Sequence, residues 1–530
     1  MNEIESIIFL LGAAALLAQL ARALNVPYPI FLVLGGLGIG FIPGLPDVEI
    51  PPEAIFLIFL PPLLNAAAVS SSPRDLRTHL RPIVLLAVGL VLATTIAVAL
   101  VAHAVIGLPW AAAFVLGAIL APTDPVAAEA IFRKLGVPGR VGTVVGGESL
   151  VNDGTGLVAF RVAVVAVVTG TFSVWEASVS FLLVGGGGIV LGLILARVIL
   201  PLWARLREPS ILITFSLLIP YAVYILAEEV LHLSGILAVV SYGLYQGWRA
   251  PRLFPEASTR LQSLAFWGVL VFVLEALLFV LVGQQLPSIV RDIEEYSAPE
   301  VLLFAALVYG AVLGARLAWF FTTPYLHPIF DRLLRNRYLR TPWQEHLVMG
   351  WSGMRGAVSL AAALAVPLTT NAGDPFPGRD LILFLTFSTI LATLVLQGFT
   401  LGPLIGALRL KDDDEAAKVV ELKARLKAAH AALGKLEQLC AEDEQIPLRS
   451  QEQMRELYED RIRRYTAGLE AGGITEEYAQ SSTVWRNWRR ELLAAEREAI
   501  VSLRDEGAIS PEVMRRIERD LDLEESRIGG

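Results

Sequence analysis

One stretch of this 530-residue chain places several oxygen-bearing side chains in apolar surroundings. Residues 146–157 read GGESLVNDGTGL within a long apolar run, so Glu148, Asn152 and Asp153 are predicted to lie at membrane depth. An ionised carboxylate at the centre of a membrane helix costs on the order of 3 kcal/mol. On a helix, Ser149 and Asp153 share one face, while Glu148 and Asn152 share the adjacent face. An aspartate with a serine hydroxyl and an asparagine carbonyl nearby is a hard oxygen site, which suits Na⁺, Li⁺ or H⁺.

A second polar group interrupts the apolar run that precedes this one. In the sequence APTDP, Pro122 and Pro125 bracket Thr123 and Asp124. Proline lacks a backbone N–H and disrupts the preceding helical turn, which frees carbonyl groups that can coordinate a cation. The positive end of the second half-helix also needs a counter-charge. The sequence leaves two interpretations open for Asp124, direct ligation of a cation or capping of the half-helix.

Several arginines lie within apolar segments, among them Arg161, Arg316 and Arg355, and a guanidinium there needs a partner. Arg355 lies in a glycine-rich stretch, and we predict that it pairs with Glu148. That pairing would leave the neighbouring aspartate free to titrate. We expect Arg161 and Arg316 to have structural roles, through pairing or snorkelling. Glu275 is a candidate partner for one of them.

Acidic centres of this kind suggest cation/proton exchange. Burial raises the pKa of a carboxyl group, and a rise from roughly 4 to roughly 7 makes protons and metal cations compete for the same oxygen atoms near neutral pH. If the protein changes access only when the site is loaded, the two ions are exchanged and the ion gradients supply the energy. The sequence contains no GxxxxGK[ST] phosphate loop. We therefore predict a secondary carrier of Na⁺ and H⁺ that is not an enzyme and needs no cofactor.

Composition divides the chain into a membrane part and a soluble part. The sequence is 55% hydrophobic with a mean hydropathy of +0.60. About 39% of residues 411–530 are charged, against about 11% of residues 1–410. These values predict an all-α polytopic membrane domain over 1–410 and a helical cytoplasmic tail over 411–530. The net charge of −8 offers no basic field for nucleic acid, and the single cysteine, Cys440, excludes an intrachain disulfide.

Thirteen apolar segments are long enough, or nearly so, to span a bilayer. Basic residues are concentrated in alternate connections, beginning with Arg22, while acidic stretches at 47–49 and 294–295 lie in the others. The positive-inside rule then places the N-terminus outside and the tail in the cytoplasm. The acidic start of the chain indicates a first spanning helix and not a cleaved signal peptide. The segments lie at 4–24, 28–45, 53–70, 82–106, 110–133, 141–169, 175–203, 210–231, 234–248, 260–286, 299–325, 343–368 and 380–408.

The fifth and twelfth segments occupy similar places in two groups of six. Each is interrupted, the fifth by APTDP (121–125) and the twelfth by GWSGMRGA (350–357). Interrupted helices at corresponding positions of two halves indicate a transporter binding site. Because one segment separates the groups, their topologies in the membrane would be inverted.

Three motifs in this order resemble the cation:proton antiporter-1 family, which includes the bacterial NhaP-type and eukaryotic NHE-type sodium/proton exchangers. They are APTDPVA (121–127), GGESLVNDGTGLV (146–158) and GWSGMRGAVSLAAAL (350–364). The resemblance spans nearly all of residues 1–410. It implies about 13 transmembrane helices with six-helix inverted repeats, crossed broken helices in segments 5 and 12, and a homodimer in the plasma membrane, the bacterial inner membrane.

The resemblance also implies roles for individual residues. Asp153 matches the ion-binding aspartate of the family, and Asn152 precedes it in the Asn-Asp pair associated with electroneutral exchange. Asp153 would hold Na⁺ together with residues of the fifth and sixth segments. The other matches are Thr123, Asp124 and Ser149 in the ion site, and Glu148 and Arg355 as a stabilising ion pair.

The chain departs from the family in its third segment. Many relatives have a glutamate shortly after a Pro-Pro pair, where LPPLLNAAA (60–68) here has Asn65 and Ala66. Any contribution of that glutamate to the ion site or to gating is therefore absent.

We therefore predict an electroneutral Na⁺ (or Li⁺)/H⁺ antiporter. A K⁺/H⁺ antiporter is the alternative, because oxygen ligands alone do not fix the size of the cation. An intramembrane aspartyl protease using Asp124 and Asp153 is an alternative of a different class. Neither the Tyr-Asp nor the Gly-x-Gly-Asp context of those enzymes is present in the sequence.

The tail alternates charged and apolar residues at helical spacing. In its last helix we expect Ser510 to act as N-cap, with Pro511 at the first helical position. The sequence leaves open whether the tail is a solvated appendage or a dimer-reinforcing or regulatory module. The predicted amphipathic helices cover 414–440, 450–470, 484–506 and 510–527.

Overall fold

The structure, a computed structural model, shows two compact units, Met1–Asp412 and Asp413–Gly530, which we describe separately. The secondary structure of the described residues is helical apart from one isolated bridge between Thr369 and Pro375. Two acidic loop stretches of the charge argument, 47–49 and 294–295, lie outside the described residues. The structure describes residues 3–24, 27–42, 52–171, 173–206, 208–253, 257–285, 287, 289, 296–334, 342–410, 414–442, 447–470, 476–506, 508 and 510–529.

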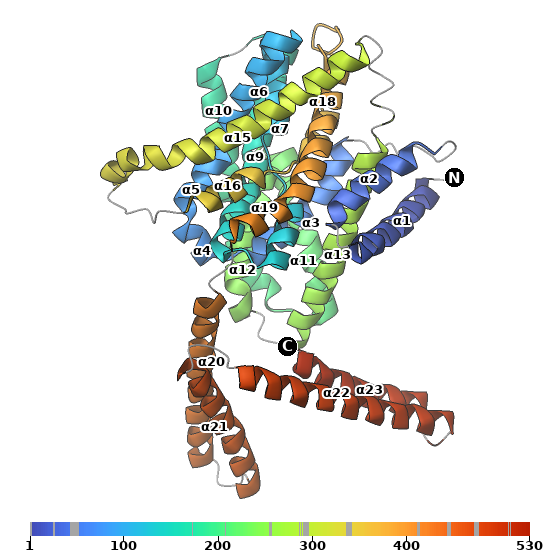
Figure 1. Cartoon of the computed structure of the whole chain (residues 1–530), viewed down its shortest axis with the longest axis vertical. Helices are drawn as coiled ribbons and strands as arrows, with labels where there is room; N and C mark the ends of the chain where they lie inside the picture. The colour runs from blue at the N-terminus through green and yellow to red at the C-terminus, as the bar shows by residue number, and fades with distance from the viewer. Residues whose placement is uncertain are drawn as a thin grey trace. The chain divides into compact units, whose positions relative to one another are not determined.

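Helices occupy all of the thirteen predicted segments of the first unit (Figure 1). Among the described residues, eight helical runs are long and apolar enough to cross a bilayer, and α2, α3 and α7 are shorter apolar helices. The expected all-α polytopic fold is therefore confirmed. The elements outside the two interrupted segments are α1 (Glu3–Ala23), α2 (Tyr28–Gly40), α3 (Pro52–Ser70), α4 (Pro73–Thr78), α5 (Leu80–Val84), η1 (Leu85–Leu90), α6 (Val91–Val101), η2 (Ala102–Ile106), α9 (Gly139–Thr169), α10 (Val174–Trp203), α11 (Pro209–Ile225), η3 (Leu226–Val230), α12 (Gly235–Leu253), α13 (Ala257–Gln284), α15 (Ala298–Leu334), α18 (Arg379–Ala392), η4 (Thr393–Gln397) and α19 (Gly398–Leu408).

Both predicted interruptions are present. The fifth segment is α7 (Trp110–Leu120) and α8 (Val126–Leu135), and the twelfth is α16 (Trp343–Trp351) and α17 (Ala357–Leu364). The two breaks touch, because the backbone N–H of Asp124 donates to the carbonyl of Met354 at 2.8 Å. Prolines explain the first break, since they remove helical N–H donors. Glycines explain the second, where an added Cβ at Gly353 would lie 2.3 Å from Cδ of Arg316.

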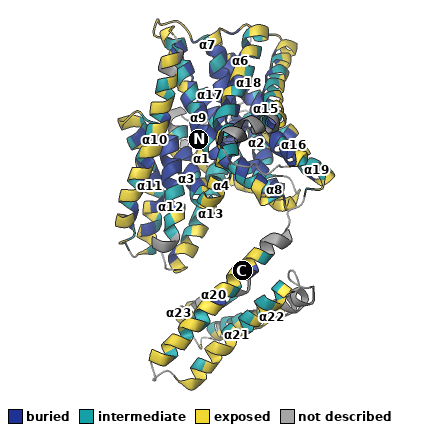
Figure 2. Ribbon diagram, turned by 90° about the vertical axis from the view of Figure 1, so that its left-hand side faces the viewer, coloured by how far each residue is buried: buried dark blue, intermediate teal, exposed yellow. Residues whose placement is uncertain are grey.

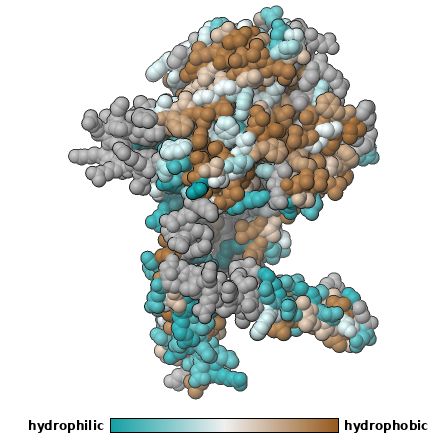
Figure 3. Space-filling view, viewed as in Figure 1, coloured by the Kyte–Doolittle hydropathy of each residue, from teal (hydrophilic) through white to brown (hydrophobic). Residues whose placement is uncertain are grey.

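Buried residues concentrate along the central helices of the first unit, including α3, α9 and α12, while α10 and α13 carry many exposed ones (Figure 2). The face of the first unit that Figure 3 shows is largely apolar. Leucines of the first unit such as Leu182, Leu264 and Leu302 are exposed. A contiguous apolar surface of this extent requires a lipid environment, because in water it would drive aggregation. The first unit is therefore a multi-pass membrane domain whose polar groups face inward.

The second unit consists of helical hairpins with a hydrophilic surface (Figure 3). In one of them, Leu493 and Leu521 are buried against each other, and Arg497 pairs with Asp522 at 2.6 Å. The predicted cap is confirmed, because the Val513 N–H donates to Oγ of Ser510 at 3.3 Å. The helices pack in pairs, α20 (Asp414–Glu442) with α21 (Leu448–Glu470), and α22 (Glu476–Asp505) with α23 (Pro511–Gly529).

Candidate ion-binding site

A cavity of about 830 Å³, which we call the ion cavity, opens beside the break between α7 and α8. Its wall includes parts of α3, α9, α13 and α17. The structure brings to this wall all four residues predicted to hold the cation, which are Thr123, Asp124, Ser149 and Asp153. Asn65 and Ala66, where the third segment departs from its relatives, line the same cavity. That departure therefore changes the wall of the cavity itself.

Helix α9 presents its polar residues on two faces, as its spacing predicts. Ser149 and Asp153 line the ion cavity, while Glu148 and Asn152 are buried behind it. Within the described part of the chain, no hydrogen bond or ion pair joins the Asp153 carboxylate to another residue. Asp153 is thus the carboxylate of α9 that has oxygen atoms available at the cavity.

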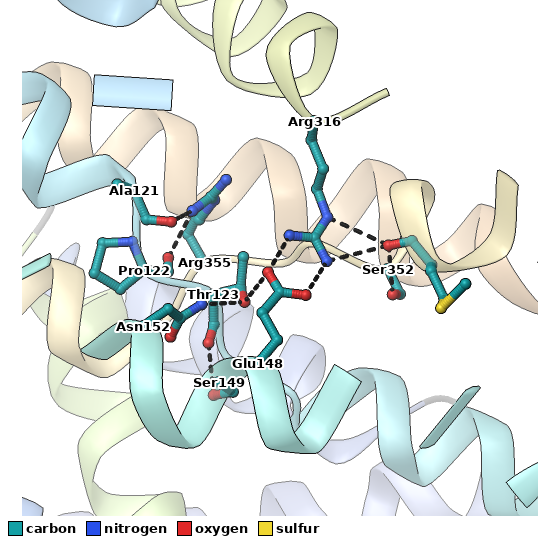
Figure 4. Close-up of polar contacts among 10 residues, drawn as sticks. Ala121, Pro122, Thr123, Glu148, Ser149, Asn152, Arg316, Ser352 and Arg355 are labelled. Atoms are coloured by element: carbon teal, nitrogen blue, oxygen red, sulfur yellow. Dashed lines mark hydrogen bonds and ion pairs between the residues drawn. The ribbon is translucent and has the colours of Figure 1, made fainter. Parts of the chain in front are cut away.

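The Thr123 side chain and carbonyl join the break of the fifth segment to α9 (Figure 4). The Ser149 hydroxyl donates to the Thr123 carbonyl at 2.7 Å. The Thr123 hydroxyl accepts from Nδ2 of Asn152 at 2.8 Å and donates to Oε1 of Glu148 at 3.3 Å. Asn152 therefore positions Thr123 from behind the wall, and in this arrangement it does not itself reach the cavity.

Asp124 makes contacts that correspond to both interpretations left open by the sequence. Its Oδ1 accepts a hydrogen bond from the N–H of Val126 at 3.0 Å, which caps the start of α8. The same side chain lines the ion cavity. A Cβ added at Gly356 would lie 1.9 Å from Oδ2 of Asp124. The carboxylate is therefore packed between the two helix breaks, and glycine at 356 makes room for it.

The predicted Glu148–Arg355 ion pair is wrong, because Glu148 pairs with Arg316 of α15 (Figure 4). Nη1 and Nη2 of Arg316 lie 2.5 and 2.9 Å from the two carboxylate oxygens. Both side chains are 1% exposed. Arg316 also donates to the Met349 carbonyl at the end of α16. The planar guanidinium thus satisfies a carboxylate and a helix end together.

Arg355 instead donates hydrogen bonds to backbone carbonyls at the break of the fifth segment. Its Nη1 donates to the carbonyls of Ala121 and Pro122, the latter at 2.7 Å (Figure 4). These carbonyls follow the C-terminal end of α7, where the helix dipole is negative and helical donors are missing. The backbone N–H of Arg355 donates to Oγ1 of Thr393 at 3.0 Å, where α18 passes into the short π-helix η4. The positive charge of the Arg355 guanidinium is therefore stabilised by the C-terminal end of α7, without a carboxylate partner.

Glu275 pairs with neither of the two arginines proposed for it. Arg161 forms an ion pair with Glu228, and Glu275 accepts a hydrogen bond from the Tyr28 hydroxyl at 2.5 Å. Both Tyr28 and Glu275 line the ion cavity. The role of Tyr28 could not be predicted from the sequence, because a tyrosine at the start of an apolar helix carries no signal of its partner.

Comparison with known proteins finds similarity to sodium/hydrogen exchangers in sequence and in fold. Residues 8–407 match the family of transmembrane sodium/hydrogen exchangers. The chain is 36% identical to an uncharacterised Na⁺/H⁺ exchanger of Mycobacterium tuberculosis, over 98% of this chain and 95% of the relative. It is 35% identical to a sodium, potassium, lithium and rubidium/H⁺ antiporter of Bacillus pumilus, over 79% and 64%. The structure resembles the sodium proton antiporter MjNhaP1 from Methanocaldococcus jannaschii at pH 8, with a TM-score of 0.61 and 25% identity, covering 77% of this chain and 98% of that one.

Proposed function

The chain belongs to the sodium/hydrogen exchanger family, and we propose that it exchanges Na⁺ or Li⁺ for H⁺ without net charge movement. One observation carries the proposal. Asp153 is a buried carboxylate at a cavity beside two touching helix breaks, and no partner within the described residues occupies its oxygen atoms. The protein is then a carrier driven by ion gradients and not an enzyme, and it needs no cofactor.

The electroneutral stoichiometry follows from which groups can change charge. The Asp153 carboxylate carries a proton in one direction of transport and a monovalent cation in the other. The loaded site is therefore neutral in both directions. Asn152 is uncharged, and Glu148 is matched by Arg316 at 2.5 Å. The carboxylate of Asp124 already balances the start of α8 through Val126. One proton therefore replaces one monovalent cation.

The transported cation would be coordinated by oxygen atoms of four residues. The Asp153 carboxylate supplies the charge, and the Ser149 hydroxyl lies one helical turn away on the same face. The break of the fifth segment adds the Thr123 carbonyl and the Asp124 carboxylate. Carboxylate, hydroxyl and carbonyl oxygens are hard ligands, which suit an alkali-metal cation.

We further propose the placement of the chain in the cell. Residues 1–410 form the antiporter domain in the plasma membrane, the bacterial inner membrane, and 411–530 form a cytoplasmic tail. The basic residues of alternate connections support an external N-terminus. The resemblance to the family supports a homodimer. The exposed apolar side chains of the first unit make membrane lipid its other partner.

K⁺/H⁺ exchange is a second candidate, and one observation favours it. The Bacillus pumilus relative is named for potassium and rubidium as well as sodium and lithium. In this chain Asn65 and Ala66 stand on the cavity wall where many relatives have a glutamate. A wall with less negative charge discriminates less in favour of small, strongly hydrated cations.

The test is transport by the purified chain in proteoliposomes with an imposed pH gradient. Addition of Na⁺ or Li⁺ should dissipate the gradient, and Asp153→Asn should abolish this. Asp380→Asn, which changes a half-exposed carboxylate outside the cavity, is the matched control and should retain full exchange. Full exchange by Asp153→Asn, or a reproducible Na⁺-dependent current at zero potential, would contradict the proposal. Equal rates with K⁺ would favour the second candidate.

A further inference from the structure

Glu129 of α8 lies where two cavities meet. A second cavity of about 570 Å³, which we call the vestibule, adjoins the ion cavity. Among the residues that line both, Glu129 carries the negative charge and Arg133 the positive charge. Glu129 is therefore the acidic side chain of the wall that the two cavities share. The shared lining residues are Ser70, Ser71, Glu129, Arg133 and Gly146.

The vestibule lies at one defined end of the membrane domain. Its wall includes Ser72 at the start of α4 and Gly139 at the start of α9. Both belong to connections rich in basic residues, which the positive-inside rule places in the cytoplasm. The vestibule therefore lies on the side of the membrane domain that this rule makes cytoplasmic.

Helix α9 is shaped to accept the Glu129 side chain. A Cβ added at Gly146 would lie 2.9 Å from Oε1 of Glu129. Gly146, Ser149 and Asp153 follow one another at helical spacing along the wall of the ion cavity. Seven residues of helix correspond to about 10 Å, so Gly146, which the Glu129 carboxylate faces, lies roughly two turns from Asp153 along α9.

The partner of Glu129 is weakly held. Nη2 of Arg133 lies 3.7 Å from Oε2 of Glu129, and the Arg133 side chain is 82% exposed. Solvent-exposed ion pairs of this kind contribute little to stability. A cation in the vestibule can therefore replace Arg133 beside the carboxylate without disturbing the fold.

We propose that Glu129 captures the transported monovalent cation on the cytoplasmic side and passes it along the α9 face to Asp153. Arg133 is its counter-ion while no cation is present. The proposal rests on the exchange function proposed above and adds a residue to its cytoplasmic path. It predicts that a change at Glu129 alters the KM for Na⁺ at the cytoplasmic face alone. A change at a residue that holds the cation beside Asp153 would alter the KM at both faces.

The test measures the KM for Na⁺ separately at each face, with the full chain in proteoliposomes of determined orientation. Glu129→Gln should raise the KM at the cytoplasmic face about fivefold, which corresponds to about 1 kcal/mol. The maximal rate and the KM at the other face should not change. Arg133→Gln should lower the cytoplasmic KM, because it removes the competing cation. If the Glu129–Arg133 ion pair had only a structural role, Glu129→Gln and Arg133→Gln would change the cytoplasmic KM for Na⁺ in the same direction.

Two glycines of α9 provide a matched pair that leaves both charges in place. Gly146→Ala should raise the cytoplasmic KM, because the new methyl group displaces the Glu129 carboxylate. Gly142→Ala should not, since nothing lies within 4 Å of its added Cβ. In a Glu129→Gln background, Gly146→Ala should have no further effect on the KM.

An unchanged KM in Glu129→Gln, or equal changes at both faces, would overturn the inference while leaving the exchange function intact. Absence of Na⁺/H⁺ exchange in the unmodified chain would overturn both proposals. The two failures are therefore distinguishable in the same set of vesicles.

Discussion

Arg316→Ala should destabilise the membrane domain strongly. It removes both hydrogen bonds from the guanidinium to Glu148, together with those to the Met349 carbonyl. Glu148 is then left 1% exposed, with the Thr123 hydroxyl at 3.3 Å as its remaining donor among the described residues. Removal of one partner of a buried ion pair costs about 3–5 kcal/mol, because the other charge stays buried and uncompensated.

A double-mutant cycle separates the pair itself from general damage to the site. Unfolding of the purified chain by SDS in mixed micelles, followed by tryptophan fluorescence, gives the free energies. Glu148→Gln should rescue much of the loss caused by Arg316→Ala, with a coupling of about 2 kcal/mol or more, since the two side chains are in contact. The coupling of Glu148→Gln with Arg355→Ala should be smaller, because Arg355 donates to the Ala121 and Pro122 carbonyls. The reverse order of the two couplings would refute the assignment of Arg316 as the partner.

Two further predictions concern the helix breaks and the tail. Gly356→Ala should reduce the exchange rate by about tenfold or more, because the new Cβ displaces the Asp124 carboxylate, and small misplacements at a site are costly. Transport by Gly406→Ala, which has nothing within 4 Å of its added Cβ, should be normal, and equal rates for both variants would contradict the packing argument. Ser510→Ala removes the cap of α23 and should cost about 0.5–2 kcal/mol locally, measured as faster amide exchange in its first turn. Unaltered protection there would show that Ser510 does not hold the helix end.

Local features of the site could be predicted from the sequence because they depend on the backbone alone. Prolines at 122 and 125 remove N–H donors, so a break follows whatever the surroundings are. The shared face of Ser149 and Asp153 follows from helical spacing in the same way. Outside the site, the Ser510 cap of the tail is also local, since its acceptor and donor are three residues apart.

The partners of the buried arginines could not be predicted, because they depend on how distant helices pack. In the sequence, Arg316 and Arg355 are equivalent candidates for Glu148. Only the packing of α15 against α16 brings Arg316 to Glu148 and to the Met349 carbonyl. The prolines predict freed carbonyls at 121–122, but nothing in the sequence shows that Arg355 is their donor. A buried guanidinium can be satisfied by helix-end carbonyls as well as by a carboxylate.

Exchange at a single carboxylate is tested most directly by proton release on cation binding. Na⁺ is added to the purified full-length chain in a weakly buffered solution with a pH indicator, while calorimetry records binding. Na⁺ binding should displace a proton from the protein, and Asp153→Asn should release none. The control, Asp380→Asn, should behave like the unmodified chain. Na⁺ binding without proton release, or unchanged release from Asp153→Asn, would contradict the account, because the two ions would then not share Asp153.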